Sequence, residues 1–210
     1  RNNPGRTYVK SLFHAAYRRE VFDKVGFFNE DLVRTEDNEI HYRMREAGYK
    51  LCFDPDIISY QYTRSSLKAM LKQKYANGFL IGKTSRVCPK CLSIYHFVPF
   101  AFVSAIIASL LAITGLGSVD GLMDKCTERT GMKRYDRGVI KKLKNIVVTL
   151  TIVMWALYGT LACTMAAVSS IKAGSKRNIT NILLPVLFLM LHISYGAGTI
   201  MGLMDKQGTA

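Results

Sequence analysis

Hydrophobic and polar positions divide this chain into a charged first part and an apolar second part. Residues 1–91 mix short apolar stretches with many charges, whereas the remainder contains three long runs without a charged side chain. These runs cover residues 92–116, 146–171 and 182–204. About 20 consecutive apolar residues suffice for a helix to cross the hydrocarbon core of a bilayer. The pattern therefore predicts three transmembrane helices; the alternative is a set of buried helices in a soluble domain, which are usually shorter.

Shorter patterns within residues 1–91 predict a mixture of strands and helices. Apolar or alternating segments with aromatic residues indicate strands at 8–16, 49–53 and 57–62. Helical spacing of apolar side chains indicates helices at 17–25, 36–47 and 66–78. Thr35 is the expected N-cap of the second helix, and the third is basic and amphipathic, so it can lie along a bilayer surface.

The connections between the apolar runs predict conflicting membrane orientations. Residues 117–145 read as a polar loop with 8 basic side chains, and residues 172–181 read as a short basic connection. If residues 1–91 are cytoplasmic, three spans place the longer loop outside, yet basic loops prefer the cytoplasm. Either the first run is re-entrant or interfacial, or this loop is an exception.

The net charge of +14 is spread along the whole chain. Residues 1–90 contribute +7, residues 91–145 contribute +4 and residues 146–210 contribute +3. A diffuse excess beside membrane segments favours anionic lipid headgroups and phosphate-bearing substrates as partners. Because no nucleic-acid-binding motif accompanies the charge, nucleic acid is not an expected partner.

The cysteines and the start of the chain add two expectations. The five cysteines are scattered, which predicts no disulfide framework and a reducing compartment for the soluble part. Cys88 and Cys91 form a lone CxxC pair around Pro89, whereas a zinc site needs about four ligands. A turn at the entrance to the first apolar run is favoured over metal or redox chemistry. Since Arg1 is not a start methionine, the chain is expected to open inside a longer protein.

Glu36 and Asp37 are the strongest candidates for chemistry. They occupy the first turn of the second predicted helix, where the helix dipole favours negative charge. A carboxylate held at a helix start can accept a proton from a reacting hydroxyl. The alternative is that both are ordinary first-turn acids that only stabilise the helix.

Three ordered segments together resemble the second half of the catalytic domain of family-2 glycosyltransferases, in particular the bacterial succinoglycan-type exopolysaccharide branch. The segments are residues 18–22, 25–32 and 34–43, and residues 192–199 also resemble that branch. The resemblance covers nearly the whole chain. It implies an α/β fold plus membrane helices: the C-terminal half of a GT-A, Rossmann-like catalytic domain in residues 1–91, followed by a transmembrane region in residues 92–210.

The resemblance also implies an inverting sugar transfer from a nucleotide-sugar to a lipid-linked glycan or a growing polysaccharide. The expected location is the inner (plasma) membrane, with the catalytic part in the cytoplasm. Asp37 takes the place of the family's general base, with Glu36 beside it. Gln73 stands where synthase-like members have a glutamine that contacts the acceptor or the diphosphate, and Lys74 stands where a basic residue is common. The following Ala76 and Asn77 depart from the pattern of processive synthases, which have Arg and Trp there.

Four further polar residues are candidates for substrate contacts. Arg64 and Lys72 are expected to reach phosphate, with a solvated or headgroup-facing basic surface as an equal alternative. His41 and Arg43 are expected to support the site or bind the acceptor. The resemblance implies Mg²⁺ or Mn²⁺ with ligands in an N-terminal half that precedes this chain, because Asp54-Pro55-Asp56 reads as a turn. Without that half, this chain alone is expected to be inactive.

Two other functions compete with glycosyl transfer. A non-catalytic membrane scaffold or partner subunit of a polysaccharide-assembly complex is the main alternative, although the intact Thr35-Glu36-Asp37 motif disfavours it. A transporter would need ionisable groups or broken helices at membrane depth. Only His96 and His192 qualify, and His192 is expected to be a hydrogen-bond donor in helix packing.

Overall fold

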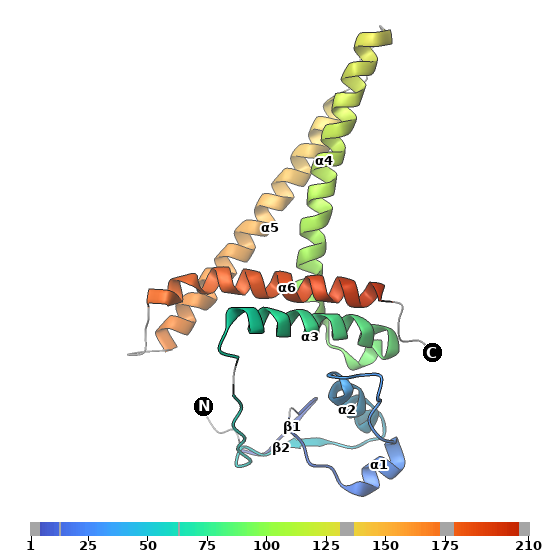
Figure 1. Cartoon of the computed structure of the whole chain (residues 1–210), viewed down its shortest axis with the longest axis vertical. Helices are drawn as coiled ribbons and strands as arrows, with labels where there is room; N and C mark the ends of the chain where they lie inside the picture. The colour runs from blue at the N-terminus through green and yellow to red at the C-terminus, as the bar shows by residue number, and fades with distance from the viewer. Residues whose placement is uncertain (1–4, 13, 63, 131–136, 173–178, 206–210) are drawn as a thin grey trace. The chain divides into compact units, whose positions relative to one another are not determined.

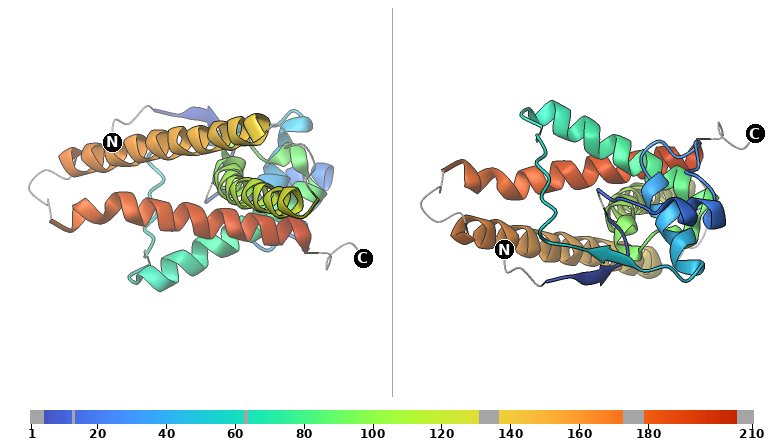
Figure 2. Two further views of the ribbon diagram at one scale, coloured as in Figure 1. Left: turned by 90° about the horizontal axis from the view of Figure 1, so that it is seen from above. Right: turned by 90° about the horizontal axis from the view of Figure 1, so that it is seen from below.

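The chain folds into two compact units, and the first of them is not continuous in sequence. The computed structural model describes residues 5–12, 14–62, 64–130, 137–172 and 179–205 (Figures 1 and 2). One unit combines Arg1–Phe100 with Ile193–Ala210, and the other covers Ala101–His192. The first unit therefore contains residues from both ends of the chain. The domain boundary predicted at residue 91 stays a prediction.

A two-stranded antiparallel sheet lies in the first unit. Strand β1 (Thr7–Val9) pairs with β2 (Leu51–Phe53), and Thr7 lies opposite Phe53. The strands predicted at 8–16 and 49–53 are therefore present but shorter, because the hydrogen-bonded ladder extends over three residue pairs. The prediction of a strand at 57–62 is wrong: this segment has no ladder partner within the described part of the chain. Its large side chains are at least 71% exposed: Ile57, Ile58, Tyr60 and Tyr62.

Helices α1 (Arg19–Val25) and α2 (Glu36–Glu46) enclose the core of this part. The buried core residues are Val21, Ile40, Met44 and Leu51. Helix α1 ends at Gly26, whose φ of +78° is a conformation that residues with a Cβ rarely adopt. Both predicted helices are confirmed within two residues at their starts. The expected cap is not made, because the Thr35 side chain accepts no hydrogen bond from the first turn of α2.

Helix α3 (Leu67–Val87) is much longer than predicted. It begins where expected, after Ser66, whose Oγ accepts a hydrogen bond of 3.2 Å from the backbone N–H of Ala69. It does not end at Gly78 but continues for nine more residues, up to the Cys88-Pro89 segment. A glycine can end a helix, but it can also allow another backbone to approach closely. Gly78 has the second role.

Gly78 and Gly82 of α3 pack against the second half of α6 (Leu184–Met204), within the first unit (Figure 1). A Cβ at either position would come closer than 3.0 Å to the backbone of α6. The same holds in reverse for Gly198 and Gly202, whose added Cβ atoms would meet the backbone of α3. Small residues on both helices therefore let the two backbones approach, as they do in pairs of membrane helices.

A short turn follows α3 and leads to the first long apolar helix. It contains the 3₁₀ helices η1 (Pro89–Cys91) and η2 (Ile94–Phe97). The turn predicted at Pro89 is confirmed. The expectation that the cysteines stay reduced is not met here, because the sulfurs of Cys88 and Cys91 are joined in a disulfide. The 3₁₀ geometry brings residues i and i+3 onto the same side, which makes this short link possible.

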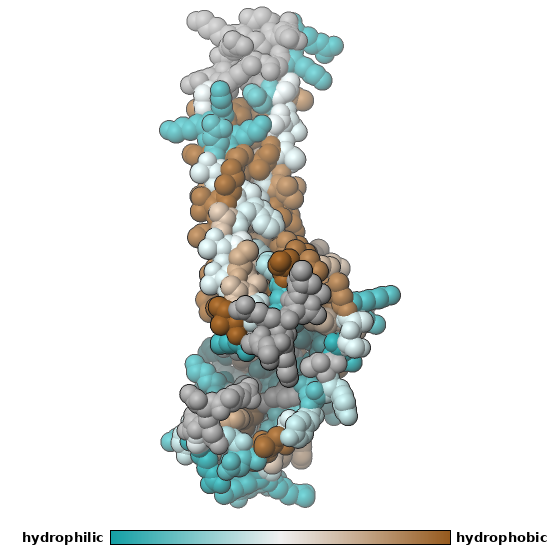
Figure 3. Space-filling view, turned by 90° about the vertical axis from the view of Figure 1, so that its left-hand side faces the viewer, coloured by the Kyte–Doolittle hydropathy of each residue, from teal (hydrophilic) through white to brown (hydrophobic). Residues whose placement is uncertain are grey.

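The second unit consists of long apolar helices. Helices α4 (Val98–Thr130) and α5 (Arg137–Lys172) supply most of it, and η4 (Ile179–Leu183) leads into α6. The three predicted spans are confirmed as helices long and apolar enough to cross a membrane. Figure 3 shows hydrophobic residues gathered along the helices, with hydrophilic residues at one end. The candidate spans run over Ile94–Leu122, Gly138–Lys172 and Asn181–Met204.

The prediction of a polar loop over residues 117–145 is largely wrong. Helix α4 continues to Thr130 and α5 already begins at Arg137. Polarity alone does not end a helix, because Lys, Leu and Met are good helix formers whether or not they face lipid. Residues 131–136 of the predicted loop, and residues 173–178 of the next connection, lie outside the described residues.

An aromatic cluster joins the helices of the second unit. Phe102 of α4 stacks on Tyr158 of α5 with ring centroids 4.4 Å apart, and the Trp155 ring meets Phe102 edge-on. The Tyr158 hydroxyl lies 3.2 Å from Nδ1 of His192 on α6. The same Nδ1 lies 2.8 Å from the carbonyl oxygen of Phe188 in its own helix, so His192 contacts α5, and its predicted role as a donor between helices stays a prediction. A histidine within a membrane helix can either hydrogen-bond to a neighbouring helix or bind a transported ion. The contact with Tyr158 favours the first role for His192.

Candidate active site

A cavity of about 560 Å³ lies at the N-terminal end of α2, within the first unit. This volume is in the range of small-molecule binding sites. Its walls come from the start of α2, the segment before α3, the middle of α3, η2 and the second half of α6. Residues far apart in the sequence thus form one site. The main polar lining residues are Arg34, Glu36, Asp37, Arg64, Gln73 and Asn77.

Asp37 lies at this cavity, in the first turn of α2. Its Oδ1 accepts a hydrogen bond of 2.8 Å from the backbone N–H of Asn38. A carboxylate that accepts from a helix N-terminus is held in place by that contact and by the helix dipole. The remaining lone pairs of its two oxygens can accept a hydrogen bond from a molecule in the cavity.

Glu36 contributes the neighbouring carboxylate. Its Oε2 is buried and makes no hydrogen bond with any residue that the structure describes. Buried polar atoms in folded proteins nearly always have a partner, so such an atom needs explanation. Because Glu36 lines the cavity, a hydroxyl or amide donor of a bound molecule is a suitable partner. The two adjacent carboxylates can therefore contact different atoms of the same ligand.

Positive charge enters the cavity from two arginines. Arg64 lies just before α3, and Arg34 lies just before the motif. The guanidinium Nη1 of Arg34 donates a hydrogen bond of 3.1 Å to Oδ1 of Asn77 on α3. Guanidinium groups bind phosphate oxygens with good geometry. The cavity thus combines carboxylates that can accept protons with cations that can hold a phosphate.

The structure brings four of the predicted site residues together. Asp37, Glu36, Gln73 and Arg64 all line the cavity. Lys72 and Lys74 do not line it; both are exposed on α3 and flank Gln73 along the helix. Successive helical residues point in directions about 100° apart, so the neighbours of a lining residue need not line the same cavity.

Sequence reasoning missed several lining residues as site candidates, among them Arg34, Asn77, His96 and Tyr195. Arg34 and Asn77 could have been found, because each adjoins a motif already recognised. His96 was considered only as an ionisable group in an apolar run. Tyr195 comes from α6, more than 100 residues along the chain from the motif, and no local pattern indicates its place.

His41 lies in the core and does not line the cavity, so of its two predicted roles the structure favours support of the site over contact with the acceptor. Its side chain is 0% exposed. Its Nδ1 lies 3.1 Å from Oγ of Ser11, and its Nε2 lies 2.6 Å from the hydroxyl of Tyr17. Both ring nitrogens therefore have partners within the protein, and neither is available to a substrate.

The environment of His41 favours its neutral form. Burial lowers the pKa of His41, and the Arg45 guanidinium lowers it further, although the Asp37 carboxylate acts in the opposite direction. Burial also raises the pKa of Tyr17, with a smaller contribution from Asp37. Tyr17 therefore keeps its proton and can donate it to Nε2 of a neutral His41.

Arg43 also makes its contacts within the protein, which favours the predicted supporting role over the predicted binding role. Its Nε and Nη2 form a two-pronged ion pair with Glu39, one turn earlier on α2, at 2.7 and 2.8 Å. The same guanidinium donates to the carbonyl oxygens of Val25 and Phe27. Its donors are thus used to fasten the end of α1 to α2, and the side chain does not line the cavity.

The residues of the cavity do not form a metal site. Among the residues that the structure describes, no group of three or more His, Cys, Asp or Glu side chains could hold a metal ion. The cavity offers two adjacent carboxylates, whereas Mg²⁺ and Mn²⁺ prefer six oxygen ligands, several of them water or phosphate. No catalytic step in this chain is therefore assigned to a metal.

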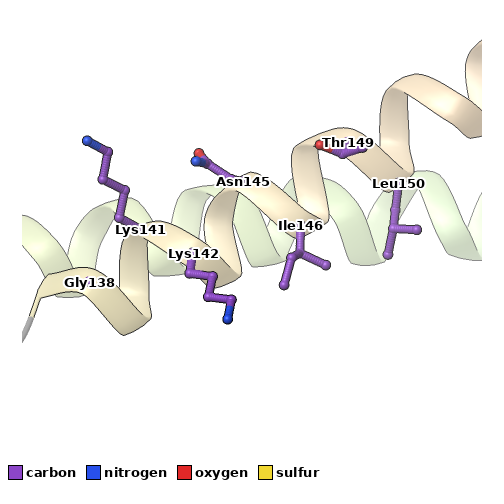
Figure 4. A pocket seen from close by; sticks show the side chains of 7 residues that line it. All are labelled: Gly138, Lys141, Lys142, Asn145, Ile146, Thr149 and Leu150. Atoms are coloured by element: carbon purple, nitrogen blue, oxygen red, sulfur yellow. The ribbon is translucent and has the colours of Figure 1, made fainter.

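A second hollow runs along one face of α5 in the other unit, with a volume of about 490 Å³. Figure 4 shows Lys142, Ile146 and Leu150 pointing to one side of the helix, one turn apart, and Lys141 to the other. No carboxylate lines the hollow, and its residues pass from basic to apolar along the helix. This is the side-chain order expected where a helix enters a bilayer, and it indicates no catalytic chemistry.

Comparison with known proteins places the chain in a family. The model for glycosyl transferase family group 2 matches residues 2–201. Among the matching relatives is dolichyl N-acetyl-alpha-D-glucosaminyl phosphate 3-beta-D-2,3-diacetamido-2,3-dideoxy-beta-D-glucuronosyltransferase of Methanococcus voltae, 33% identical over 89 residues, which are 42% of this chain and 26% of that protein. Another is succinoglycan biosynthesis protein ExoA of Rhizobium meliloti (strain 1021), 28% identical over 100 residues, which are 48% of this chain and 30% of that protein.

The chain thus spans less than a third of the length of either relative in the matched regions. No solved structure matches it significantly. The family match, in contrast, covers nearly all of the chain and includes both the candidate site and the apolar helices. The predicted family and the predicted combination of a glycosyltransferase segment with three apolar helices are therefore confirmed, and the chain belongs to glycosyl transferase family group 2.

Proposed function

We propose that this chain is the base-bearing part of an inverting glycosyltransferase that acts in the synthesis of an exopolysaccharide or another cell-surface glycan. The sugar would come from a nucleotide-sugar and pass to a lipid-linked glycan or a growing chain. The observation that carries the proposal is the meeting of Asp37, Glu36, Arg64 and Gln73 at one cavity. The family match and the relatives in glycan synthesis support it.

Asp37 acts as the general base in this proposal. An acceptor hydroxyl in the cavity attacks the anomeric carbon of the donor, and the bond from that carbon to the diphosphate oxygen breaks. The hydroxyl proton passes to Asp37, so that the attacking oxygen develops less positive charge. Glu36, through its unpartnered buried oxygen, accepts a hydrogen bond from another acceptor group and orients it.

Arg34 and Arg64 meet the other requirement of the reaction. The departing nucleoside diphosphate gains negative charge as the sugar leaves, and fixed positive groups stabilise that charge in the transition state. Both guanidinium groups line the cavity that Asp37 lines. Gln73 can donate its amide protons to the same phosphate or to the acceptor.

A lipid-linked acceptor fits the origin of two cavity residues. His96 belongs to one candidate membrane span and Tyr195 to another. A substrate anchored in the bilayer can reach such a cavity without leaving the membrane. The name of the Methanococcus relative also specifies a dolichyl phosphate-linked substrate. We place the protein in the inner (plasma) membrane with the cavity on the cytoplasmic side, where nucleotide-sugars are made.

Donor binding requires residues beyond those of this chain. The Mg²⁺ or Mn²⁺ implied by the family resemblance would be held by an upstream segment, together with the nucleotide. We expect the 210-residue chain alone to be inactive for this reason.

Transfer by the full-length gene product, assayed in membranes, tests this function. Membranes are incubated with a panel of radiolabelled nucleotide-sugars, and label in the lipid and polysaccharide fractions is measured. Because a general base contributes about 10²–10⁴-fold, Asp37→Asn should reduce transfer at least about a hundredfold. Asp23→Asn on α1, an exposed acidic residue away from the cavity, is the matched control and should keep wild-type activity.

Two results would contradict the proposal. Undiminished transfer by Asp37→Asn would remove Asp37 from the base position. Absence of transfer from every donor by the wild-type protein would instead favour the non-catalytic partner subunit of a polysaccharide-assembly complex.

A further inference from the structure

A buried pair of threonine hydroxyls links the start of α2 to α3. Oγ1 of Thr35 lies 2.5 Å from Oγ1 of Thr84, although 49 residues separate them in the sequence. Thr35 is 5% exposed and Thr84 is 0% exposed. Water therefore does not compete for this hydrogen bond, and the Thr35 hydroxyl has Thr84 as its partner.

The direction of the hydrogen bond follows from counting protons. Oγ1 of Thr84 is also 2.8 Å from the carbonyl oxygen of Leu80, to which it donates. A hydroxyl has one proton to donate and two lone pairs that accept. Since Thr84 donates to Leu80, Thr35 must donate to Thr84. The two bonds form a short chain from the start of α2 into the backbone of α3.

Thr35 makes this contact and does not make the local one that its position would allow. A threonine at an N-cap position usually accepts a hydrogen bond from the helix that it begins, worth about 1 kcal/mol. Thr35 occupies that position without making the bond. Its hydroxyl is instead hydrogen-bonded to Thr84 on α3. This contact fixes the position of the start of α2 relative to α3 and does not cap α2.

We propose that Thr84 is a positioning residue for the catalytic base: through Thr35 it holds Asp37 at a fixed distance from the cavity wall on α3. The inference rests on the proposed function of Asp37. Thr35 and Asp37 are two residues apart in the first turn of α2, so a shift of one moves the other. Leu80, the acceptor at the end of the hydrogen-bond chain, itself lines the cavity.

The expected effect is on the rate of transfer. General-base catalysis requires the carboxylate to lie within hydrogen-bonding reach of the acceptor hydroxyl, and a displacement of about 1 Å can reduce the rate by about 10²-fold. Thr84 does not line the cavity, so its loss leaves the groups that bind the nucleotide-sugar in place. Removal of its hydroxyl should therefore lower kcat and leave KM for the donor nearly unchanged.

The test uses isosteric variants of the full-length protein in membranes. Thr84→Val removes the hydroxyl and keeps the shape, Thr84→Ser keeps the hydroxyl, and Thr35→Val removes the other partner. Thr199→Val is the matched control, because Thr199 is also 0% exposed but donates within its own helix, to the carbonyl of Tyr195. Transfer rates are divided by the amount of folded protein. That amount is taken from the amplitude of the thermal unfolding transition in detergent.

We expect kcat to fall about ten- to a hundredfold in Thr84→Val and Thr35→Val, with KM for the nucleotide-sugar within about twofold. Thr84→Ser should restore most of the wild-type kcat, and Thr199→Val should retain it. Thr84→Val leaves the buried Thr35 hydroxyl without its partner, whereas the double variant Thr35→Val with Thr84→Val removes both hydroxyls, so the double variant should fold better than Thr84→Val. Its kcat should nevertheless stay low.

A double variant with wild-type kcat would overturn the proposal, since it would show that only the unpaired hydroxyl and not the lost link had mattered. Wild-type kcat in a stably folded Thr84→Val protein would overturn it as well. Both outcomes leave the proposed function intact as long as Asp37→Asn abolishes transfer. Undiminished transfer by Asp37→Asn would remove the base itself and this positioning role with it.

Discussion

Two residues on the same face of one helix have different surroundings in this chain. Asp37 and His41 are one turn apart on α2, yet Asp37 lines the cavity whereas His41 is enclosed by Ser11 and Tyr17. The sequence predicted a helix over residues 36–47 and predicted that the acids of its first turn belong to a site. It could not separate a histidine at the site from one in the core, because Ser11 and Tyr17 come from another segment.

The buried His41 predicts a dependence of stability on pH. Its pKa in the folded protein lies below its ordinary value of 6.5, so the unfolded state binds more protons below that pH. The contribution of neutral His41 to the free energy of unfolding is therefore complete above about pH 6.5 and is lost as the pH falls below it. We expect His41→Gln to be less stable than wild type by about 1–3 kcal/mol at pH 7.5.

That difference should become smaller at pH 5.5, because only the wild-type protein bears the cost of keeping this imidazole neutral. Unfolding midpoints of both proteins in detergent at the two pH values measure the change. An equal difference at both values would show that His41 does not titrate differently on folding.

At the scale of elements, helix starts were easier to predict than helix ends. Ser66 begins α3 through a local hydrogen bond that the sequence shows directly. The end of α3 was missed because Gly78 contacts the backbone at Tyr195, a partner more than 100 residues away. The segment 57–62 was missed for a related reason: its alternating pattern is that of a strand, but a strand also requires a neighbour.

The glycine contact between α3 and α6 predicts sensitivity to larger side chains. Gly82→Leu should push the two helices apart, since even a Cβ there would lie closer than 3.0 Å to the backbone of α6. Overpacking of this kind costs about 1–3 kcal/mol or more, which exceeds the gain in helix propensity on replacing glycine. A lower thermal unfolding midpoint of the protein in detergent is the expected result.

Gly159→Leu on α5 is the matched control, because no atom lies within 4 Å of a Cβ at that position. It should leave the midpoint unchanged or raise it. Equal midpoints for the two variants would show that α3 and α6 are not in close contact.

At the scale of the whole molecule, the three apolar runs were the most predictable feature. Each run exceeds the length needed to cross a bilayer, and this property depends on composition and not on distant contacts. The division into units was not predictable, since the residues of α6 from Ile193 onward belong with the first hundred residues. Helix boundaries outside the apolar runs were also missed, because polar residues on α4 and α5 continue the helices.

Three apolar helices predict that the protein behaves as an integral membrane protein. It should stay in the membrane pellet after washes with high salt and with alkaline carbonate, which remove proteins bound only by charge. Detergent should release it. The +14 net charge makes this test necessary, because a peripheral basic protein would also sediment with membranes at low salt. Release by the alkaline wash would contradict the three-span assignment.

The discontinuous first unit has a consequence for the order of synthesis. A ribosome makes Asp37 and Gln73 long before Tyr195, which lines the same cavity from α6. The face of α3 that carries Gly78 and Gly82 has no α6 to pack against until the last helix has been translated. The cavity is therefore completed only after the intervening apolar helices have been translated. A nascent chain released before α6 is made therefore carries Asp37 and Gln73 without Tyr195, the residue with which α6 lines the cavity.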